Sequence, residues 1–506
     1  MRFWGILSLA TLAVAAPAAQ GTVQAQEADI NSNSGRAAAI IEAFRHSWTG
    51  YKTYAWGYDE LLSVSNKGGN SRNGWGASIA DALSTAILMR QRDVVHDCLQ
   101  HLSSVDFTKT STEVSLFETT IRYLGGLISA YDLLTGPYAD LVSWHDKRLV
   151  KSLLTQAVVL ADRLSFAFNT STGIPYNNLN FSTNSSSDTT NGVATIGTLV
   201  LEWTRLSDLT GDPKYARLAQ KAEGYLLDPH PSLGEPFPGM LGTDVDISTG
   251  QFRDSSGGWS GGTDSFYEYL LKMWIYDQSR YKNYLDRWVV AVESTIKNLL
   301  QTPEKGVTWV AEYSSANMIR KTEGHLTCFI GGNLILGGTL LGRKDIKQAG
   351  IDLTDGCRHA YSSTPSGLAP ERWSWDPAGV PVKQSVFFIE NGFYATSSGY
   401  YLRPEVVESY YHGYALTGDP KYQQWAWEAF LAINRTARTP SGFSSITDVM
   451  QENGGGQDDF QESFWFAEVL KYLYMIFEGG LAVGVKGGRN QWVFNTEAHP
   501  VRVKLV

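Results

Sequence analysis

Two carboxylates three residues apart follow an Arg-Pro pair in the segment 403–408, Arg-Pro-Glu-Val-Val-Glu. Proline suits the first turn of a helix, because the N–H that it lacks has no helical partner there. Glu405 and Glu408 would then share one face of that turn, where the partially positive helix N-terminus favours ionised carboxylates. Such groups suit a general base or the outer shell of a bound cation. The ordinary alternative is a capped surface helix with solvated glutamates.

Two further segments place an acid among apolar residues or glycines. Glu118 and Arg122 lie four residues apart on one expected helix face; apolar neighbours raise a carboxyl pKa, whereas an arginine lowers it. Asp264 follows Gly261 and Gly262, and glycines allow a ligand or backbone to approach closely. A structural ion pair and a helix N-cap are the ordinary interpretations of these two acids.

Three more segments combine acids, aromatics and hydroxyls. His325 precedes a cysteine, but no second His or Cys follows at zinc spacing, which argues against a transition metal. Phe464 and Glu468 share a helical face, and Thr496 and Glu497 lie in a terminal turn. Several acids beside glycines and aromatics suit glycoside hydrolysis, which needs two carboxyl groups around the bond. They also suit calcium, which prefers oxygen ligands. Serine-hydrolase elbows, zincin helices and nucleotide fingerprints are not found in the sequence.

Apolar residues recur at the helical period along most of the chain. The heptapeptide Leu-Thr-Gly-Asp-Pro-Lys-Tyr occurs twice, at 209–215 and 416–422. In each copy Gly would end one helix, and Asp and Pro would begin the next. Repeated helical hairpins predict an all-α solenoid or its closed form, a toroid, as one domain over 35–506. The expected helices cover 36–47, 76–91, 114–134, 148–166, 193–209, 213–226, 263–277, 283–300, 325–341, 345–362, 385–400, 404–417, 420–436 and 462–478.

The N-terminus predicts the compartment. Met1 and Arg2 precede an apolar run and then small residues, which indicates a secretory signal peptide and polar leader over 1–25; a signal anchor is the alternative. The mature chain would then be secreted or lie in the lumen of the secretory pathway. Three cysteines predict one disulfide, for which we favour Cys328 with Cys357, because Cys98 lies in an apolar helical pattern. The net charge of −9 argues against nucleic-acid binding. The predicted N-glycosylation sites are Asn169, Asn180, Asn184 and Asn434.

These motifs together resemble the class I α-1,2-mannosidases, glycoside hydrolase family 47, and most closely its secreted fungal members. The resemblance runs from about Arg45 to Pro500, and residues 45–60 are similar to the family's opening signature. It implies an (αα)7 barrel with minor β-hairpins, one of which plugs the barrel. It also implies that terminal α-1,2-linked mannose is removed from high-mannose N-glycans with inversion. Calcium would be bound by Thr496, through its side-chain oxygen and carbonyl, with waters and sugar hydroxyls completing the shell.

Carried over to this sequence, the resemblance implies three catalytic acids. Glu405 would be the base that activates water, Glu118 is the favoured general acid, directly or through a water, and Asp264 is the rival acid. An inverting pair lies about 6.5–9.5 Å apart. Cys328 and Cys357 match the family disulfide. The other positions implied to line the sugar pocket or to hold calcium-bound waters are Arg122, His325, Arg403, Pro404, Glu408, Phe464, Glu468 and Glu497.

The sequence departs from the family pattern at two positions. Members that cut one particular mannose carry an arginine where this chain has Gly262, which predicts a roomier pocket and trimming of several mannoses. Ser84 stands where many relatives have an aspartate.

Two other functions stay open. The first is a glycan-binding, quality-control-type relative with little hydrolysis, although such relatives tend to lack the cysteine pair. The second is a structural α-toroid or another α/α-barrel polysaccharide enzyme, which leaves residues 495–497 unexplained. The sequence gives no indication of an oligomer, so a monomer is expected.

Overall fold

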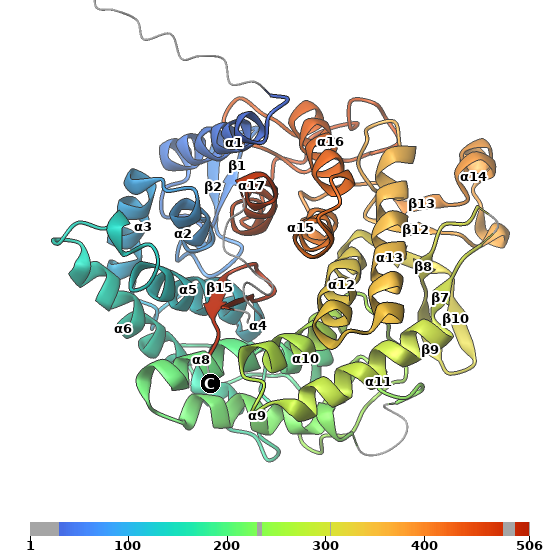
Figure 1. Ribbon diagram of the computed structural model, residues 1–506. Helices are drawn as coiled ribbons and strands as arrows, with labels where there is room; N and C mark the ends of the chain where they lie inside the picture. Colours follow the sequence, from blue (N-terminus) through green and yellow to red (C-terminus); the bar gives the residue numbers. More distant parts are fainter. Residues whose placement is uncertain (1–29, 230–234, 304, 479–490, 505–506) are drawn as a thin grey trace, which may run out of the picture.

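The computed structural model describes residues 30–229, 235–303, 305–478 and 491–504. The predicted signal peptide and leader lie outside the described residues. Within them, fourteen helices of nine or more residues form a closed double ring, with one ring inside the other (Figure 1). The inner helices are α2 (Ala77–Leu88), α5 (Gly125–Leu134), α8 (Val200–Thr210), α10 (Asp264–Tyr276), α12 (Phe329–Leu341), α15 (Glu405–Thr417) and α17 (Leu470–Glu478). The outer helices are α1 (Asn33–Tyr54), α3 (Arg92–Ser104), α6 (Lys147–Leu164), α9 (Lys214–Leu227), α11 (Lys282–Asn298), α13 (Lys344–Ser363) and α16 (Lys421–Thr436).

Each inner helix packs against the outer helix that follows it, and α17 closes the ring by packing against α1. The predicted (αα)7 barrel is therefore confirmed for the described part of the chain. The burial pattern explains the two rings. Every residue of α2 is buried, because an inner helix has neighbours on all sides. In α6 the buried residues recur three or four apart from Val150 to Leu164, which is the single apolar face of an outer helix.

The two ends of the ring differ. Each connection from an inner helix to its outer partner contains no named β-strand among the described residues, whereas the outer-to-inner connections carry the short strands. In both copies of the predicted turn, Gly211 and Gly418 adopt a positive φ and end α8 and α15. Asp212 and Asp419 then accept a hydrogen bond from the first backbone N–H of the next helix, each at 2.9 Å. The predicted hairpin turn is confirmed.

The strands pair antiparallel, in two-stranded ladders and in one three-stranded sheet, β11-β12-β13. They are β1 (Glu60–Leu62), β2 (Lys67–Gly69), β3 (Val114–Ser115), β4 (Asn178–Leu179), β5 (Thr190–Gly192), β6 (Asp244–Asp246), β7 (Leu300–Gln301), β8 (Trp309–Val310), β9 (Glu312–Ser315), β10 (Met318–Arg320), β11 (Thr322–Gly324), β12 (Arg372–Ser374), β13 (Tyr394–Ser397), β14 (Trp492–Phe494) and β15 (Pro500–Arg502). The last pair, β14–β15, packs against α10 and α5 inside the ring (Figure 1). This hairpin is the predicted plug.

Several expected helices differ from the observed ones. Helix α3 was not among the expected helices. Its first turn is charged, which makes its apolar stripe difficult to recognise in the sequence; the stripe consists of Val94, Val95, Cys98, Leu99 and Leu102. The expected helix 385–400 is wrong: Gly392, at φ 79°, ends the short α14 (Ser385–Asn391), and β13 follows. The expected helix 114–134 is divided into β3, α4 (Leu116–Glu118), a π-helical turn (Thr119–Leu124) and α5. A second π-helical turn (Trp465–Val469) precedes α17, and α7 (Val193–Gly197) precedes α8.

The cysteines take the predicted arrangement. Cys328 and Cys357 form a disulfide that ties the start of α12 to α13. Cys98 is a buried free thiol. Among the described residues, no helix has both the length and the apolar character needed to cross a membrane.

Candidate active site

A cavity of about 300 Å³ opens at the end of the ring that carries the strands. This volume is in the range of small-molecule sites. Its walls come from the connections that enter the inner helices and from the first turns of those helices; its floor is the tip of the plug hairpin. The lining residues are Arg72, Phe117, Glu118, Ile121, Arg122, Asp264, Ser265, Glu268, Leu326, Phe329, Arg403, Glu405, Glu408, Glu462, Phe464, Glu468, Thr496 and Glu497.

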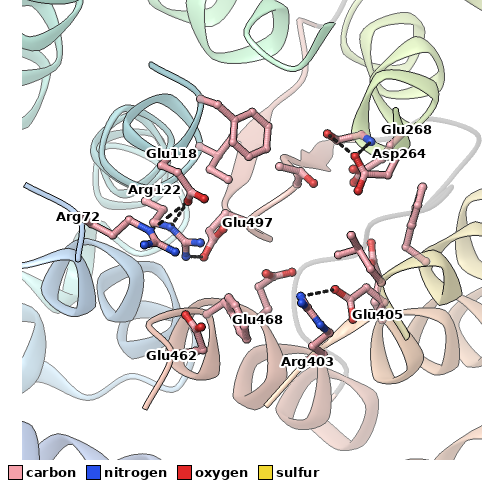
Figure 2. A pocket seen from close by; sticks show the side chains of 18 residues that line it. Arg72, Glu118, Arg122, Asp264, Glu268, Arg403, Glu405, Glu462, Glu468 and Glu497 are labelled. Atoms are coloured by element: carbon pink, nitrogen blue, oxygen red, sulfur yellow. Dashed lines mark hydrogen bonds and ion pairs between the residues drawn. The ribbon is translucent and has the colours of Figure 1, made fainter. Parts of the chain in front are cut away.

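The cavity brings together most of the residues that the sequence predicted. Segments as far apart as Glu118 and Glu497 meet in it (Figure 2). Two predicted residues do not line it. Pro404 precedes the first residue of α15, and His325 is fully buried behind Glu405.

Glu405, the first residue of α15, is held by a histidine from behind. Nδ1 of His325 lies 2.8 Å from Glu405 Oε2, and Nε2 lies 2.7 Å from the hydroxyl of Tyr361. In front, Arg403 Nη1 lies 4.0 Å from Glu405 Oε1. The guanidinium of Arg403 donates instead to Glu371, with both Nε contacts at 2.7 Å. Glu405 is thus fixed in orientation while one oxygen faces the cavity, which suits a base.

Glu118 lies on the other side of the cavity, paired with two guanidinium groups (Figure 2). Arg122 Nε donates to Glu118 Oε2 at 2.8 Å, and Arg72 Nε lies 3.3 Å from the same oxygen. Burial alone would raise the pKa of Glu118, but the charges of Arg122 and Arg72 outweigh it and hold the pKa below its ordinary value. In the free cavity Glu118 is therefore ionised at neutral pH.

Asp264, the first residue of α10, has the opposite surroundings. Its Oδ1 accepts a hydrogen bond from the N–H of Ser265 at 2.8 Å. Burial, together with the nearby carboxylates of Glu268 and Glu405 and against that hydrogen bond, raises its pKa to about 7. Asp264 therefore holds a proton over the lower part of the neutral range, as an acid catalyst must.

The cavity floor contains an excess of acids. Burial raises the pKa of Glu408 to about 8, in spite of Lys272, and raises the pKa values of Glu468 and Glu497 well above their ordinary range. Carboxylates that resist ionisation together gain from a divalent cation among them. With Thr496 at the same floor, the donor set is made of oxygens, which is the set that calcium prefers. The residues therefore fit a calcium ion.

Comparison with known proteins identifies the family. The family model described as glycosyl hydrolase family 47 matches residues 43–503. The chain belongs to glycosyl hydrolase family 47. A mannosyl-oligosaccharide alpha-1,2-mannosidase of Coccidioides posadasii is 56% identical over 92% of this chain and 91% of its own length. One from Penicillium citrinum is 52% identical over 98% of both. The structure of an alpha-1,2-mannosidase from Trichoderma reesei superposes with a TM-score of 0.90, at 47% identity, over 94% of this chain and all of its own.

Three acidic or basic lining residues of this family 47 cavity were not singled out from the sequence. Glu268 stands one helical turn after Asp264, a spacing that could have indicated a shared face. Glu462 begins the segment that contains Phe464, but no sequence pattern marks it as a site residue. Arg72 lies in a loop without periodicity. The loop is folded around the buried carboxylate of Asp59. This carboxylate accepts hydrogen bonds from the backbone N–H group of Arg72, at 2.8 Å, and from those of residues 74–77.

The departure at Ser84 lies behind the floor rather than in the cavity. Ser84 Oγ is 3.0 Å from His499 Nδ1, and His499 Nε2 is 3.2 Å from Asp81 Oδ1. Burial lowers the pKa of His499 to about 4, against the effect of Asp81. A neutral serine therefore lies on one side of this neutral imidazole.

The predicted glycosylation sites are all outside the cavity lining. Asn169, Asn180 and Asn184 are exposed. Asn434 is half-buried in α16, where its Oδ1 accepts a hydrogen bond from Arg438. Glycan attachment at these four residues stays a prediction.

Proposed function

We propose that this protein is a calcium-dependent glycoside hydrolase that removes terminal α-1,2-linked mannose from high-mannose N-glycans with inversion. The observation that carries the proposal is the cavity in which Glu405, Asp264 and Glu118 meet above an oxygen-rich floor. The names of the relatives, mannosyl-oligosaccharide alpha-1,2-mannosidases, support the substrate class.

Glu405 is proposed as the base. His325 orients its carboxylate, and Glu371 holds Arg403 away from a full ion pair with it. A carboxylate fixed in this way can take a proton from a water that attacks the anomeric carbon. The C–O bond to the leaving sugar then breaks, and the leaving oxygen receives a proton from the acid.

Two residues compete for the role of the acid. The pKa of about 7 at Asp264 favours it as the proton donor in the free cavity. Glu118, paired with Arg122 and Arg72, could donate only a proton relayed through a shared water. Both assignments keep the acid and the base on different residues, as inversion requires.

Calcium is proposed to bind at Thr496, with Glu408, Glu468 and Glu497 around it. When bound, a calcium ion supplies positive charge and oxygen coordination sites that fix sugar hydroxyls. Phe464 offers an apolar face against a sugar ring, since it lines the same cavity and is almost fully buried.

Gly262 supports trimming of more than one mannose. Its φ is 100°, and a Cβ there would lie 2.8 Å from Thr243 Cγ2. A side chain at this position would be both strained and crowded, so this part of the wall stays bare.

The location is proposed as secreted or in the lumen of the secretory pathway, and the protein as a monomer. The buried disulfide supports an oxidising compartment.

The test is mannose release from a Man9 N-glycan with and without a calcium chelator, with the anomer of the freed sugar followed by NMR. Release of β-mannose that the chelator stops is the expected result. Release of α-mannose would contradict inversion. Calcium-dependent glycan binding without release would instead support the glycan-binding alternative.

A further inference from the structure

The turn Asn495–His499, between β14 and β15, carries the floor of the cavity. Asn495 Oδ1 accepts hydrogen bonds from the N–H groups of Glu497 at 3.0 Å and His499 at 2.8 Å, so its side chain closes the inside of the turn. Ala498 adopts φ 53°, a left-handed conformation that a residue with a Cβ rarely takes. A turn of this shape needs support from outside.

Two buried lysines hold the carbonyl groups on either side of Thr496. Lys272 Nζ, from α10, donates to the carbonyl of Asn495 at 3.2 Å and also pairs with Glu268. Lys471 Nζ, from α17, donates to the carbonyl of Ala498 at 2.6 Å. Lys471 is fully buried, and among the described residues no carboxylate lies within ion-pair distance of its ammonium group.

The other side of the turn is held by a tyrosine and an acid. The N–H of Thr496 donates to the hydroxyl of Tyr269 at 3.1 Å, and this hydroxyl donates to Glu202 Oε1 at 2.7 Å. Asn495 Nδ2 donates to the same oxygen of Glu202 at 2.8 Å. Three inner helices, α8, α10 and α17, therefore fix one short turn.

Lys471 is unusual because its charge works against the proposed cation. A buried ammonium without a carboxylate partner is costly, and it repels a nearby calcium ion. Within the described part of the chain, its hydrogen bond to the Ala498 carbonyl is the only direct hydrogen bond or ion pair of Lys471, although the charges of Glu468, Asp81 and Glu497 act on it from farther away. Such a residue supports a cation site through the geometry that it imposes, and not through its charge.

We propose that Lys471 is a positioning residue of the cation site, which holds the Ala498 carbonyl and so fixes Thr496 at the cavity floor. The inference rests on the calcium site of the proposed function. It makes Lys471 part of the supporting shell that orients the ligand, and such shells typically change metal affinity by about 10- to 100-fold when they are removed.

The test is the calcium affinity of the full chain, measured by isothermal titration calorimetry in the absence of glycan. Lys471→Met keeps the length of the side chain and removes its donor. We expect its Kd for calcium to rise at least about tenfold. An unchanged or lower Kd would overturn the proposal, because loss of a repelling charge alone tightens binding.

Lys347→Met is the matched control. Lys347 Nζ also donates to a backbone carbonyl, that of Leu416 at 3.2 Å. This contact lies at the opposite end of the ring, where the inner helices turn into their outer partners. The Kd of Lys347→Met for calcium should equal that of the wild type. If Lys471→Met does not fold, Tyr269→Phe removes the partner of the Thr496 N–H and should raise the Kd in the same way; an unchanged Kd there also counts against the proposal.

Hydrogen exchange of the metal-free protein separates this inference from the proposed function. The amides of 492–502 should exchange faster in Lys471→Met than in the wild type, whereas those of α9 should not change. Equal exchange in the turn would overturn the positioning role. Faster exchange in Lys471→Met than in the wild type, together with no uptake of calcium by the wild type, would instead confirm the support of the turn and overturn the cation site.

Discussion

Carboxylates that share one cavity differ in what they can do because their immediate neighbours differ. Glu118 is paired with two arginines and is ionised, whereas Asp264 lies near two other acids and keeps its proton. The same principle distinguishes Glu405, whose histidine and arginine neighbours fix its orientation. The proposed roles of acid and base therefore follow from contacts that are a few ångströms long.

We predict that kcat/KM falls as the pH rises through about 7. Below that pH Asp264 is protonated and can donate; above it the carboxyl is ionised and cannot. Asp264→Asn should lower kcat by about 10²–10⁴-fold, and its residual activity should lack this alkaline limb. The measurement is a pH profile of the wild type, Asp264→Asn and Glu118→Gln. A limb that persists in Asp264→Asn and disappears in Glu118→Gln would assign the acid to Glu118.

At the scale of the element, the inner helices place their first turns at one end of the ring. Asp264 and Glu405 are each the first residue of a helix, where the helix dipole favours negative charge. Two π-helical turns contribute Arg122 and Glu468. Such turns are frequent at functional sites, because they rotate the following side chains out of the α-helical register.

The repeated turn gives a prediction about backbone strain. Gly211 and Gly418 have positive φ and open space around a built Cβ, so an alanine would suffer from the backbone conformation alone. Each Gly→Ala change should cost about 1–2 kcal/mol in the free energy of unfolding, measured by chemical denaturation. Gly224→Ala in α9 is the control: it also meets open space, but at a helical φ. It should stabilise by about 0.5–1 kcal/mol, and equal losses at all three sites would contradict the explanation.

Helix α9 also carries a buried acid that destabilises the fold at neutral pH. Glu223 is fully buried, and neither carboxyl oxygen has a hydrogen-bond partner in the described part of the chain. Burial raises its pKa well above 4.5. From about pH 4.5 upwards the unfolded chain ionises this group while the folded chain does not, so stability is lost as the pH rises.

Glu223→Leu should therefore stabilise the protein by about 1–3 kcal/mol at pH 7, and by less at pH 4.5. The measurement is the free energy of unfolding of wild type and variant between pH 4.5 and 7. An equal gain at both pH values would mean that packing, and not ionisation, is responsible.

The sequence predicted those elements that have strong local signals. The proline before Glu405, the glycines before Asp264 and the duplicated turn each follow from the needs of one helix end. Arg72 and Glu462 were missed because they lie in connecting loops, whose conformation depends on distant partners such as Asp59. The contact between His325 and Glu405 spans 80 residues of sequence. A contact of that kind is set by the closed ring and by no local pattern.

At the scale of the whole molecule, the inner ring of helices in the described part of the chain and the β14–β15 hairpin meet at one acidic floor. Removal of calcium should therefore destabilise the whole ring. At a free calcium concentration of 100 times the Kd, binding adds about 2.7 kcal/mol to the free energy of unfolding. The measurement is the thermal midpoint with calcium, with chelator and with magnesium. Magnesium should substitute poorly, because it requires a smaller and more rigid shell. The same midpoint with calcium and with chelator would argue against a cation in the native state.

The pairing of α1 with α17 has a consequence for synthesis of the chain. The ring cannot close until α17, the partner of α1, has been made. The turn with Thr496 follows α17 in the sequence. A growing chain on the ribosome therefore has Glu118, Asp264 and Glu405 before it has the turn beneath them. Under the proposed function, an interrupted translation product that lacks the β14–β15 hairpin would carry most of the protein but lack its cation site, and we expect it to be inactive.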